Sequence, residues 1–412
     1  MGEPTSSDSR PARPLPVGAF PLPFGYLLLP GVAEAAPVRA GLLVGRLPTA
    51  WPDALRGHER ALAGDLSGAR EAFAGDDPVS RFNRLVIDPA SVDPAQLRAD
   101  LGHDLAPLVD VVLFTLGESD ALPGVDDLDG ECRALLLSAY AARAVQAEEV
   151  SEAIRLLEDA VACVPEEYPA LGGVMNGALG FLCQQAGAIE QAIDSLQRGL
   201  SLLAGTDLDV ALAEQHLQLA SIYQEQAGSR RDLLAKAVHH YHCAVQAVTE
   251  HQSPELFAAA HANLATAYLT MPMVEASDQL RFGVAVGSLR AALRVYTPAT
   301  HPQQWASAQL NLANALVYAP ATRRADNLVE AVEAYEAVLA VRNRTNDPLG
   351  YARVLANQGN ALAHLGLFDQ AWGKLVEARF LFEEFHEYDA VTSVRGVLDE
   401  IARQRSATGT GG

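Results

Sequence analysis

A repeated pattern of small and large apolar residues is the feature that most constrains the fold of this 412-residue chain. Each unit has a small residue, then an alanine 12 to 20 positions later, then a large apolar residue four positions after the alanine. The last two residues share one face of a helix, where a small residue lets a neighbouring helix approach closely. Six units follow this order: Ala141, Ala153 and Leu157; Gly180, Ala192 and Leu196; Ala220, Ala237 and Tyr241; Ala265, Ala285 and Leu289; Ala313, Ala331 and Tyr335; Gly359, Ala371 and Leu375.

The first helix of several units also carries a leucine before its small residue, as in Leu179-Gly180 and Leu312-Ala313, and Pro165 closes a unit. These residues resemble the tetratricopeptide repeat family, whose unit is a helix–turn–helix of 34 residues. The segment from His301 to Leu328 is similar to the longer bacterial variant of this repeat. The resemblance implies an all-α fold, a right-handed superhelical solenoid of helix-turn-helix hairpins.

The spacing of the pattern predicts the organisation of the whole chain. The Pro-rich and Gly-rich stretch near the N-terminus is expected to be irregular or a short hairpin, followed by helices over Pro78–Ile87 and Asp93–Leu116. We expect a disordered leader at 1–18, a capping region at 19–130 with a degenerate repeat as a candidate at 51–77, six repeats at 131–385, a closing helix at 386–405 and a disordered tail at 406–412.

Three of the units contain extra residues between their two helices. The distance from the small residue to the alanine is 12 in the first, second and sixth units, but 17, 20 and 18 in the others. Insertions of this kind form loops on one edge of a solenoid, and these loops are an alternative place for recognition. We assign them to Gly228–Asp232, Met271–Met273 and Pro320–Asn327.

The charge balance excludes some classes of partner. Lys and Arg number 30 and Asp and Glu number 51, so the formal net charge is −21, which disfavours binding to nucleic acid or to an anionic membrane surface. Prolines interrupt the apolar stretch at 14–33, which argues against membrane insertion and against an export signal, although a signal peptide stays an alternative. The four cysteines form no C-x-x-C pair, and a cytoplasmic protein is expected.

Motifs for catalysis or cofactor binding are not found in the sequence. Gly373-Lys374 lacks the surrounding residues of a phosphate-binding loop, and no zinc-protease, nucleophile-elbow or dinucleotide motif occurs. We therefore predict a protein that is not an enzyme and has no cofactor. No metal site is predicted, although His239, His242 and Cys243 share a helical face and are weak candidates. The alternative for these three is solvent-facing histidines beside a buried thiol.

A row of amide side chains provides a candidate binding surface. The resemblance implies that the residue two positions before each small residue faces the concave groove, and four consecutive units have an amide there: Gln218, Asn263, Asn311 and Asn357. Asn314 and Asn360 follow the small residue in two units, and Arg353 shares a helix face with Asn357. A carboxamide both donates and accepts, so such a row suits an extended peptide backbone. The alternative is that these amides cap neighbouring helices or face solvent.

These features predict a non-catalytic adaptor or assembly factor that binds a protein or peptide partner in the concave groove. A peptide-sensing regulator would use the same groove. A self-assembling scaffold, and hence a homo-oligomer, is a further alternative, because terminal apolar faces of repeat arrays need covering. An enzyme would need residues 20–130 to bring an unrecognised set of polar groups to the groove.

Overall fold

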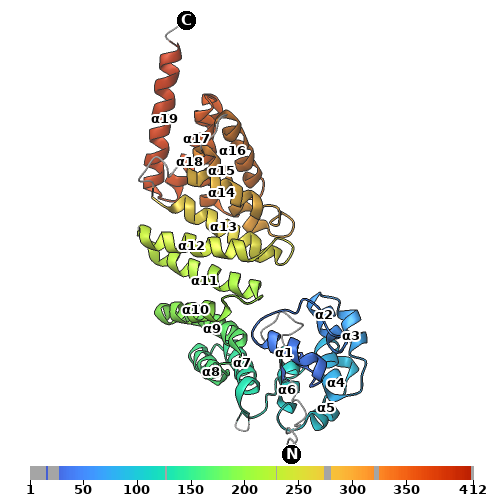
Figure 1. Cartoon of the computed structure of the whole chain (residues 1–412). Helices are drawn as coiled ribbons and strands as arrows, with labels where there is room; N and C mark the ends of the chain where they lie inside the picture. The colour runs from blue at the N-terminus through green and yellow to red at the C-terminus, as the bar shows by residue number, and fades with distance from the viewer. Residues whose placement is uncertain are drawn as a thin grey trace, which may run out of the picture. The chain divides into compact units, whose positions relative to one another are not determined.

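The computed structural model describes residues 15–16, 27–125, 128–228, 230–272, 280–319 and 324–409, which are predominantly helical. The chain divides into two compact units, Met1–Ile222 and Tyr223–Gly412, and the division falls inside helix α11 (Asp209–Ala227). Helices that follow each other in the repeats pack against one another in most cases within each unit (Figure 1). The predicted all-α fold of stacked helix hairpins is thereby confirmed.

The N-terminal part of unit 1 combines a small strand pair with short helices. Strands β1 (Leu15–Pro16) and β2 (Leu28–Leu29) pair antiparallel, so part of the predicted leader is ordered, while 1–14 and 17–18 lie outside the described residues. The α-helices that follow are α1 (Ala36–Leu43), α2 (Arg56–Leu62), α3 (Leu66–Ala72), α4 (Pro78–Ile87), α5 (Pro94–Leu101) and α6 (Ala106–Thr115), with 3₁₀ turns at Ala33–Ala35, Asp53–Leu55 and Pro89–Ser91.

One helix predicted in this region is two helices in the structure. The expected helix at Asp93–Leu116 is interrupted between α5 and α6, so that prediction was wrong at its centre. Gly102 ends α5 with a φ of 72°, a conformation that glycine adopts without steric cost, and the chain then turns before α6 begins. The helix predicted at Pro78–Ile87 has the expected limits.

Longer helices make up the repeats. Proline stands in the first turn of α9, α13, α15 and α17, where its missing N–H breaks no helical hydrogen bond. The helices of unit 1 are α7 (Gly130–Gln146), α8 (Val150–Cys163), α9 (Pro169–Gln185) and α10 (Ile189–Leu203) before α11. Those of unit 2 are α12 (Arg231–Ala247), α13 (Pro254–Thr270), α14 (Leu280–Ala292), α15 (Pro302–Tyr318), α16 (Arg324–Leu339), α17 (Pro348–His364), α18 (Phe368–Glu384) and α19 (Tyr388–Gly409).

The repeat pattern corresponds to a contact between the two helices of a hairpin. A Cβ atom built on Gly180 would lie 2.6 Å from Cγ of Leu196, and a Cβ on Gly359 would lie 2.6 Å from Cγ of Leu375. The small residue of the first helix therefore receives the large residue of the second helix, as the spacing predicts. The same relationship joins α2 and α3, where a Cβ on Gly57 would lie 2.5 Å from the Phe73 ring.

One hydrophobic core serves the N-terminal helices and the first repeats. Leu28 and Leu42 belong to the same buried cluster as Leu171 and Leu203. The loop after α1 is also held by Asp207, which accepts a 2.7 Å hydrogen bond from the Leu47 N–H and donates its own N–H to the Gly45 carbonyl at 2.7 Å. The predicted domain limits remain predictions, but unit 1 has no break in its core near residue 130.

Strand β2 is fixed by two buried polar side chains. Asn83 accepts a 2.7 Å hydrogen bond from the Leu28 N–H and donates to the Leu28 carbonyl at 2.9 Å, so it pairs with the backbone as a neighbouring strand would. His58 lies 2.9 Å from the same carbonyl through Nε2, and its ring meets the Phe73 ring edge to face. Burial lowers the pKa of His58 to about 4, so the imidazole is neutral at neutral pH.

Some helix limits differ from those expected. The closing helix predicted at 386–405 is α19, which continues to Gly409, so 406–409 are helical and 410–412 lie outside the described residues. Arg324–Asn327, assigned above to an insertion, form the first turn of α16, and Asp232 lies in the first turn of α12. Within the described ranges, no helix has the length and hydropathy needed to span a bilayer.

Candidate functional site

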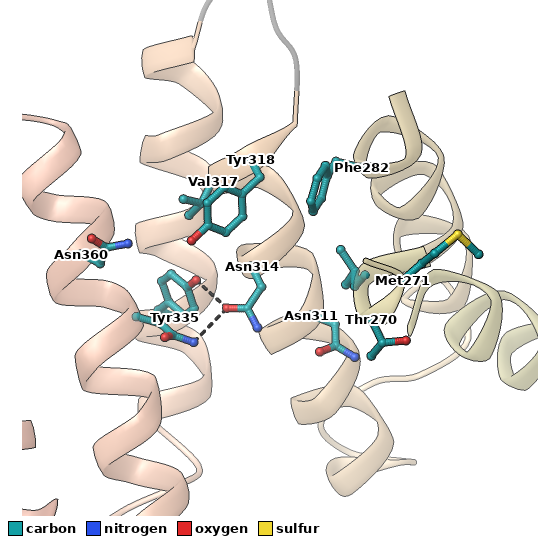
Figure 2. A pocket seen from close by; sticks show the side chains of 11 residues that line it. Thr270, Met271, Phe282, Asn311, Asn314, Val317, Tyr318, Tyr335 and Asn360 are labelled. Carbon is teal, nitrogen blue, oxygen red and sulfur yellow. Dashed lines mark hydrogen bonds between the residues drawn. The ribbon is translucent and has the colours of Figure 1, made fainter. Parts of the chain in front are cut away.

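A cavity of about 510 Å³ opens on unit 2, on the side where its first helices carry amide side chains. The first helices α13, α15 and α17 and the second helices α14 and α16 all contribute to it, and Figure 2 shows their side chains around the space. Its wall is formed by Leu269, Thr270, Met271, Phe282, Asn311, Asn314, Val317, Tyr318, Tyr335, Asn357 and Asn360. Four of the seven predicted binding residues therefore meet in one place.

Two of the asparagines bond to the preceding repeat. Nδ2 of Asn311 donates to the hydroxyl of Thr266 on α13 at 3.2 Å, and Nδ2 of Asn357 donates to Oδ1 of Asn314 on α15 at 3.0 Å. Thr266 and Asn314 occupy the same position of their repeats, the one after the small residue. The amides thus link successive first helices, and they do so through side-chain oxygens and not by capping a neighbouring helix.

Tyr335 fixes the orientation of the Asn314 amide. Its hydroxyl donates to Oδ1 of Asn314 at 2.7 Å, and burial raises the pKa of Tyr335 well above its ordinary value, so the phenol keeps its proton. Because Oδ1 of Asn314 accepts from both Tyr335 and Asn357, its Nδ2 points away from these two partners (Figure 2). Asn314 consequently offers a hydrogen-bond donor to the cavity.

The remaining amide groups are available to a ligand. Within the described residues, the bonds above leave Nδ2 of Asn314 and Oδ1 of Asn311 and of Asn357 without a protein partner. The Asn360 side chain makes no hydrogen bond to any described residue. The site therefore presents two fixed acceptors, one fixed donor and one amide that is free to rotate.

The other predicted site residues lie apart from this cavity. Asn263 is half-buried on α13 and is not among the lining residues, and Gln218 belongs to unit 1, where its Oε1 is buried without a hydrogen bond to the described residues. Arg353 is exposed on α17 and lies 3.8 Å from a carboxylate oxygen of Glu387. Their binding roles remain predictions.

An apolar wall completes the cavity, and the sequence reasoning above missed it. Phe282 and Tyr318 come from α14 and α15, with ring centroids 5.7 Å apart, and Val317 lies beside them. Tyr335 appears in the sequence only as the large residue of its repeat. Its hydroxyl was the available signal, because a buried phenol needs a hydrogen-bond partner nearby. Tyr241, at the same position of another repeat, likewise donates to Gln224 at 2.9 Å.

The three weak candidates for metal binding, His239, His242 and Cys243, do not converge on one point. Nε2 of His242 lies 2.7 Å from the Tyr268 hydroxyl, whereas Sγ of Cys243 lies 3.9 Å from Nε2 of His239. Burial raises the pKa of the Cys243 thiol and lowers that of the His242 imidazole. Across the part of the chain that the structure describes, no three His, Cys, Asp or Glu side chains are grouped to hold a metal ion.

Comparisons with known proteins give distant structural likenesses. No family model and no curated protein matches the chain. The apo form of RapI is 12% identical with a TM-score of 0.42, over 66% of this chain and 99% of RapI. BtubC from P. vanneervenii is 20% identical with a TM-score of 0.40, over 61% and 92%. A Rap protein complexed with competence and sporulation factor is 12% identical with a TM-score of 0.38, over 85% and 97%.

Proposed function

We propose that this chain is a non-catalytic binding protein, an adaptor or assembly factor, that holds an extended segment of a polypeptide partner along α13, α15 and α17. The observation that carries the proposal is the cavity in which four asparagines of two successive repeats converge. Their unpaired donor and acceptor atoms match what a peptide backbone offers at each residue. The free cysteines and the acidic composition fit a cytoplasmic protein.

The fixed orientation of these amides favours binding. A side chain that is already immobilised by neighbouring hydrogen bonds loses little further conformational freedom when it meets a ligand. Asn314 and Asn357 are held in this way before any ligand arrives. The bonds between repeats therefore support the proposed binding role, since they keep the amides in place.

A partner search with a matched pair of variants tests the proposal. Full-length protein is used as bait for partners from its host and for a phage-displayed library of random dodecapeptides, and the bound species are then titrated against variants. Asn360→Ala removes a lining amide that has no hydrogen bond to the described residues, and Gln303→Ala removes an exposed amide of α15 that does not line the cavity.

We expect Asn360→Ala to weaken binding by about two- to ten-fold, the range for losing one hydrogen bond of roughly 0.5–1.5 kcal/mol. Gln303→Ala should leave the affinity unchanged. If neither Asn360→Ala nor other substitutions in the cavity changed the affinity of any bound species, recognition would lie elsewhere, for example in the loops between the two helices of a repeat.

A further inference from the structure

We infer that the cavity selects an uncharged segment with one large apolar side chain, preferably aromatic, whose backbone carbonyl accepts a hydrogen bond from Nδ2 of Asn314. This inference rests on the proposed function and names the chemistry of the segment bound there. Charged residues of the partner would then lie outside the cavity.

The apolar wall indicates where the side chain would lie. Phe282 is 9% exposed and Val317 is 4% exposed, so both are held firmly, whereas Tyr318 is 58% exposed and leaves most of its ring uncovered. The ring of Tyr318 is tilted by 40° to that of Phe282 (Figure 2). An aromatic ring of the partner could pack edge to face against this pair and cover Tyr318, which removes apolar surface from water.

The polar part of the wall excludes charge. None of the described residues that line the cavity is Asp, Glu, Lys, Arg or His, although the whole chain has a formal net charge of −21. A charged side chain placed here would lose its hydration and find no ion of opposite sign among the described lining residues, which is strongly unfavourable. The acidic chain attracts a basic partner at long range, but the described lining residues include no carboxylate to receive the basic group.

The orientation of the Asn314 amide determines which backbone group of the ligand can bond to it. Its Oδ1 is occupied by the Tyr335 hydroxyl and the Asn357 amide, so only Nδ2 can turn to the ligand. A ligand carbonyl satisfies this donor. Asn314→Asp would keep an acceptor for Tyr335 and Asn357 but would replace the donor by a second carboxylate oxygen. This variant therefore separates the binding role of Asn314 from its structural role.

The test starts with random dodecapeptides displayed on phage, selected on the full-length protein and then made synthetically. Binding of the strongest peptide is measured by calorimetry against wild-type protein, Asn314→Asp and Gln303→Ala. The peptide is also made with its central large residue changed to Ala, to Glu and to Lys. Circular dichroism and thermal unfolding show whether Asn314→Asp keeps its fold.

We expect an uncharged core with a Phe, Tyr, Trp or Leu in the selected peptides, and at least a ten-fold loss of affinity for the Glu and Lys peptides and for Asn314→Asp. Gln303→Ala should bind normally. If the selected peptides lost affinity for Asn314→Asp and yet needed a charged central residue in order to bind, that result would overturn the inference and leave the proposed function standing. Absence of any selected peptide, or binding that no cavity variant alters, would overturn the proposed function itself.

Discussion

Asn357 on α17 donates from Nδ2 to Oδ1 of Asn314 on α15 across 3.0 Å, and the same oxygen accepts the Tyr335 hydroxyl at 2.7 Å. One atom of Asn314 therefore connects two repeats and a buried phenol. This relationship separates the lining amides into those that also stabilise the fold and those that do not.

The first prediction compares two lining amides. Asn314→Ala leaves the buried Tyr335 hydroxyl without its acceptor, and an unsatisfied buried group costs about 1–3 kcal/mol. Asn360→Ala breaks no bond to the described residues and should change the free energy of unfolding by no more than about 0.5 kcal/mol. Urea unfolding followed by circular dichroism measures both. Equal stability of the two variants would show that the Tyr335 hydroxyl finds another partner.

The second prediction concerns the contact inside a repeat. Gly359→Val forces new atoms against Leu375, where a Cβ alone would lie 2.6 Å from Cγ, and overpacking of this kind costs about 1–3 kcal/mol. Gly373→Val is the control, because a Cβ on Gly373 in α18 has no heavy atom within 4 Å. Thermal unfolding should show a loss only for Gly359→Val. The double variant with Leu375→Ala should lose less stability than the sum of the two single losses, and a simple sum would contradict the contact.

The third prediction is a loss of stability in acid that comes from His58. Its pKa is about 4 in the folded protein and 6.5 ordinarily, so between these values the unfolded chain binds more protons than the folded one. Stability is then greatest above pH 6.5 and decreases as the pH falls towards 4, by on the order of 3 kcal/mol. Hydrogen exchange of amides around β2 between pH 7 and pH 5 measures this loss.

His58→Gln is the matched variant for that experiment. Its amide nitrogen can donate to the Leu28 carbonyl in place of Nε2, but it takes up no proton in this pH range. The acid-dependent part of the loss should therefore disappear in His58→Gln, whatever its stability at pH 7. If wild-type protein and His58→Gln lost stability in the same way as the pH falls, groups other than His58 would be responsible for the loss.

The fourth prediction concerns the loop between α1 and the 3₁₀ turn at Asp53–Leu55. Asp207→Ala removes the acceptor of the Leu47 N–H, a bond that contributes about 0.5–1.5 kcal/mol. The Leu47 amide should exchange faster with solvent, while amides of α13 to α18 keep their protection. Asp207→Asn retains an oxygen for this bond and should protect Leu47 more than Asp207→Ala does. Equal exchange in all three proteins would mean that other contacts hold the loop.

Much of the fold could be predicted from the sequence because the repeat is set by local packing. The spacing that relates Gly180 to Leu196 recurs at Gly359 and Leu375, and in both hairpins the glycine receives the leucine. Such a contact depends only on the helical period and on the difference in size between the two side chains, and both can be read from the sequence. The break at Gly102 was missed because a single glycine is compatible with a continuous helix as well as with a turn.

The candidate site was predictable only in part. Asn311, Asn314, Asn357 and Asn360 were found because they recur at fixed places in the repeat, and the structure brings them to one cavity. The acceptor to which each side-chain amide donates was not predictable, because it depends on the distance between the first helices of neighbouring repeats. Phe282 and Tyr318 were missed because they come from helices of different repeats and share no sequence period.

The bonds from Asn311 to Thr266 and from Asn357 to Asn314 make the hairpins that begin with α13, α15 and α17 interchangeable with one another. The hairpins that begin with α13, α15 and α17 each carry an asparagine two positions before the small residue and a possible acceptor one position after it. If the hairpin of α15 and α16 were deleted, Asn357 would meet Thr266, which already accepts from an asparagine at that position. Recombination among these three hairpins could therefore shorten or lengthen this part of the array by whole hairpins while each new junction kept a donor and an acceptor at the matching positions.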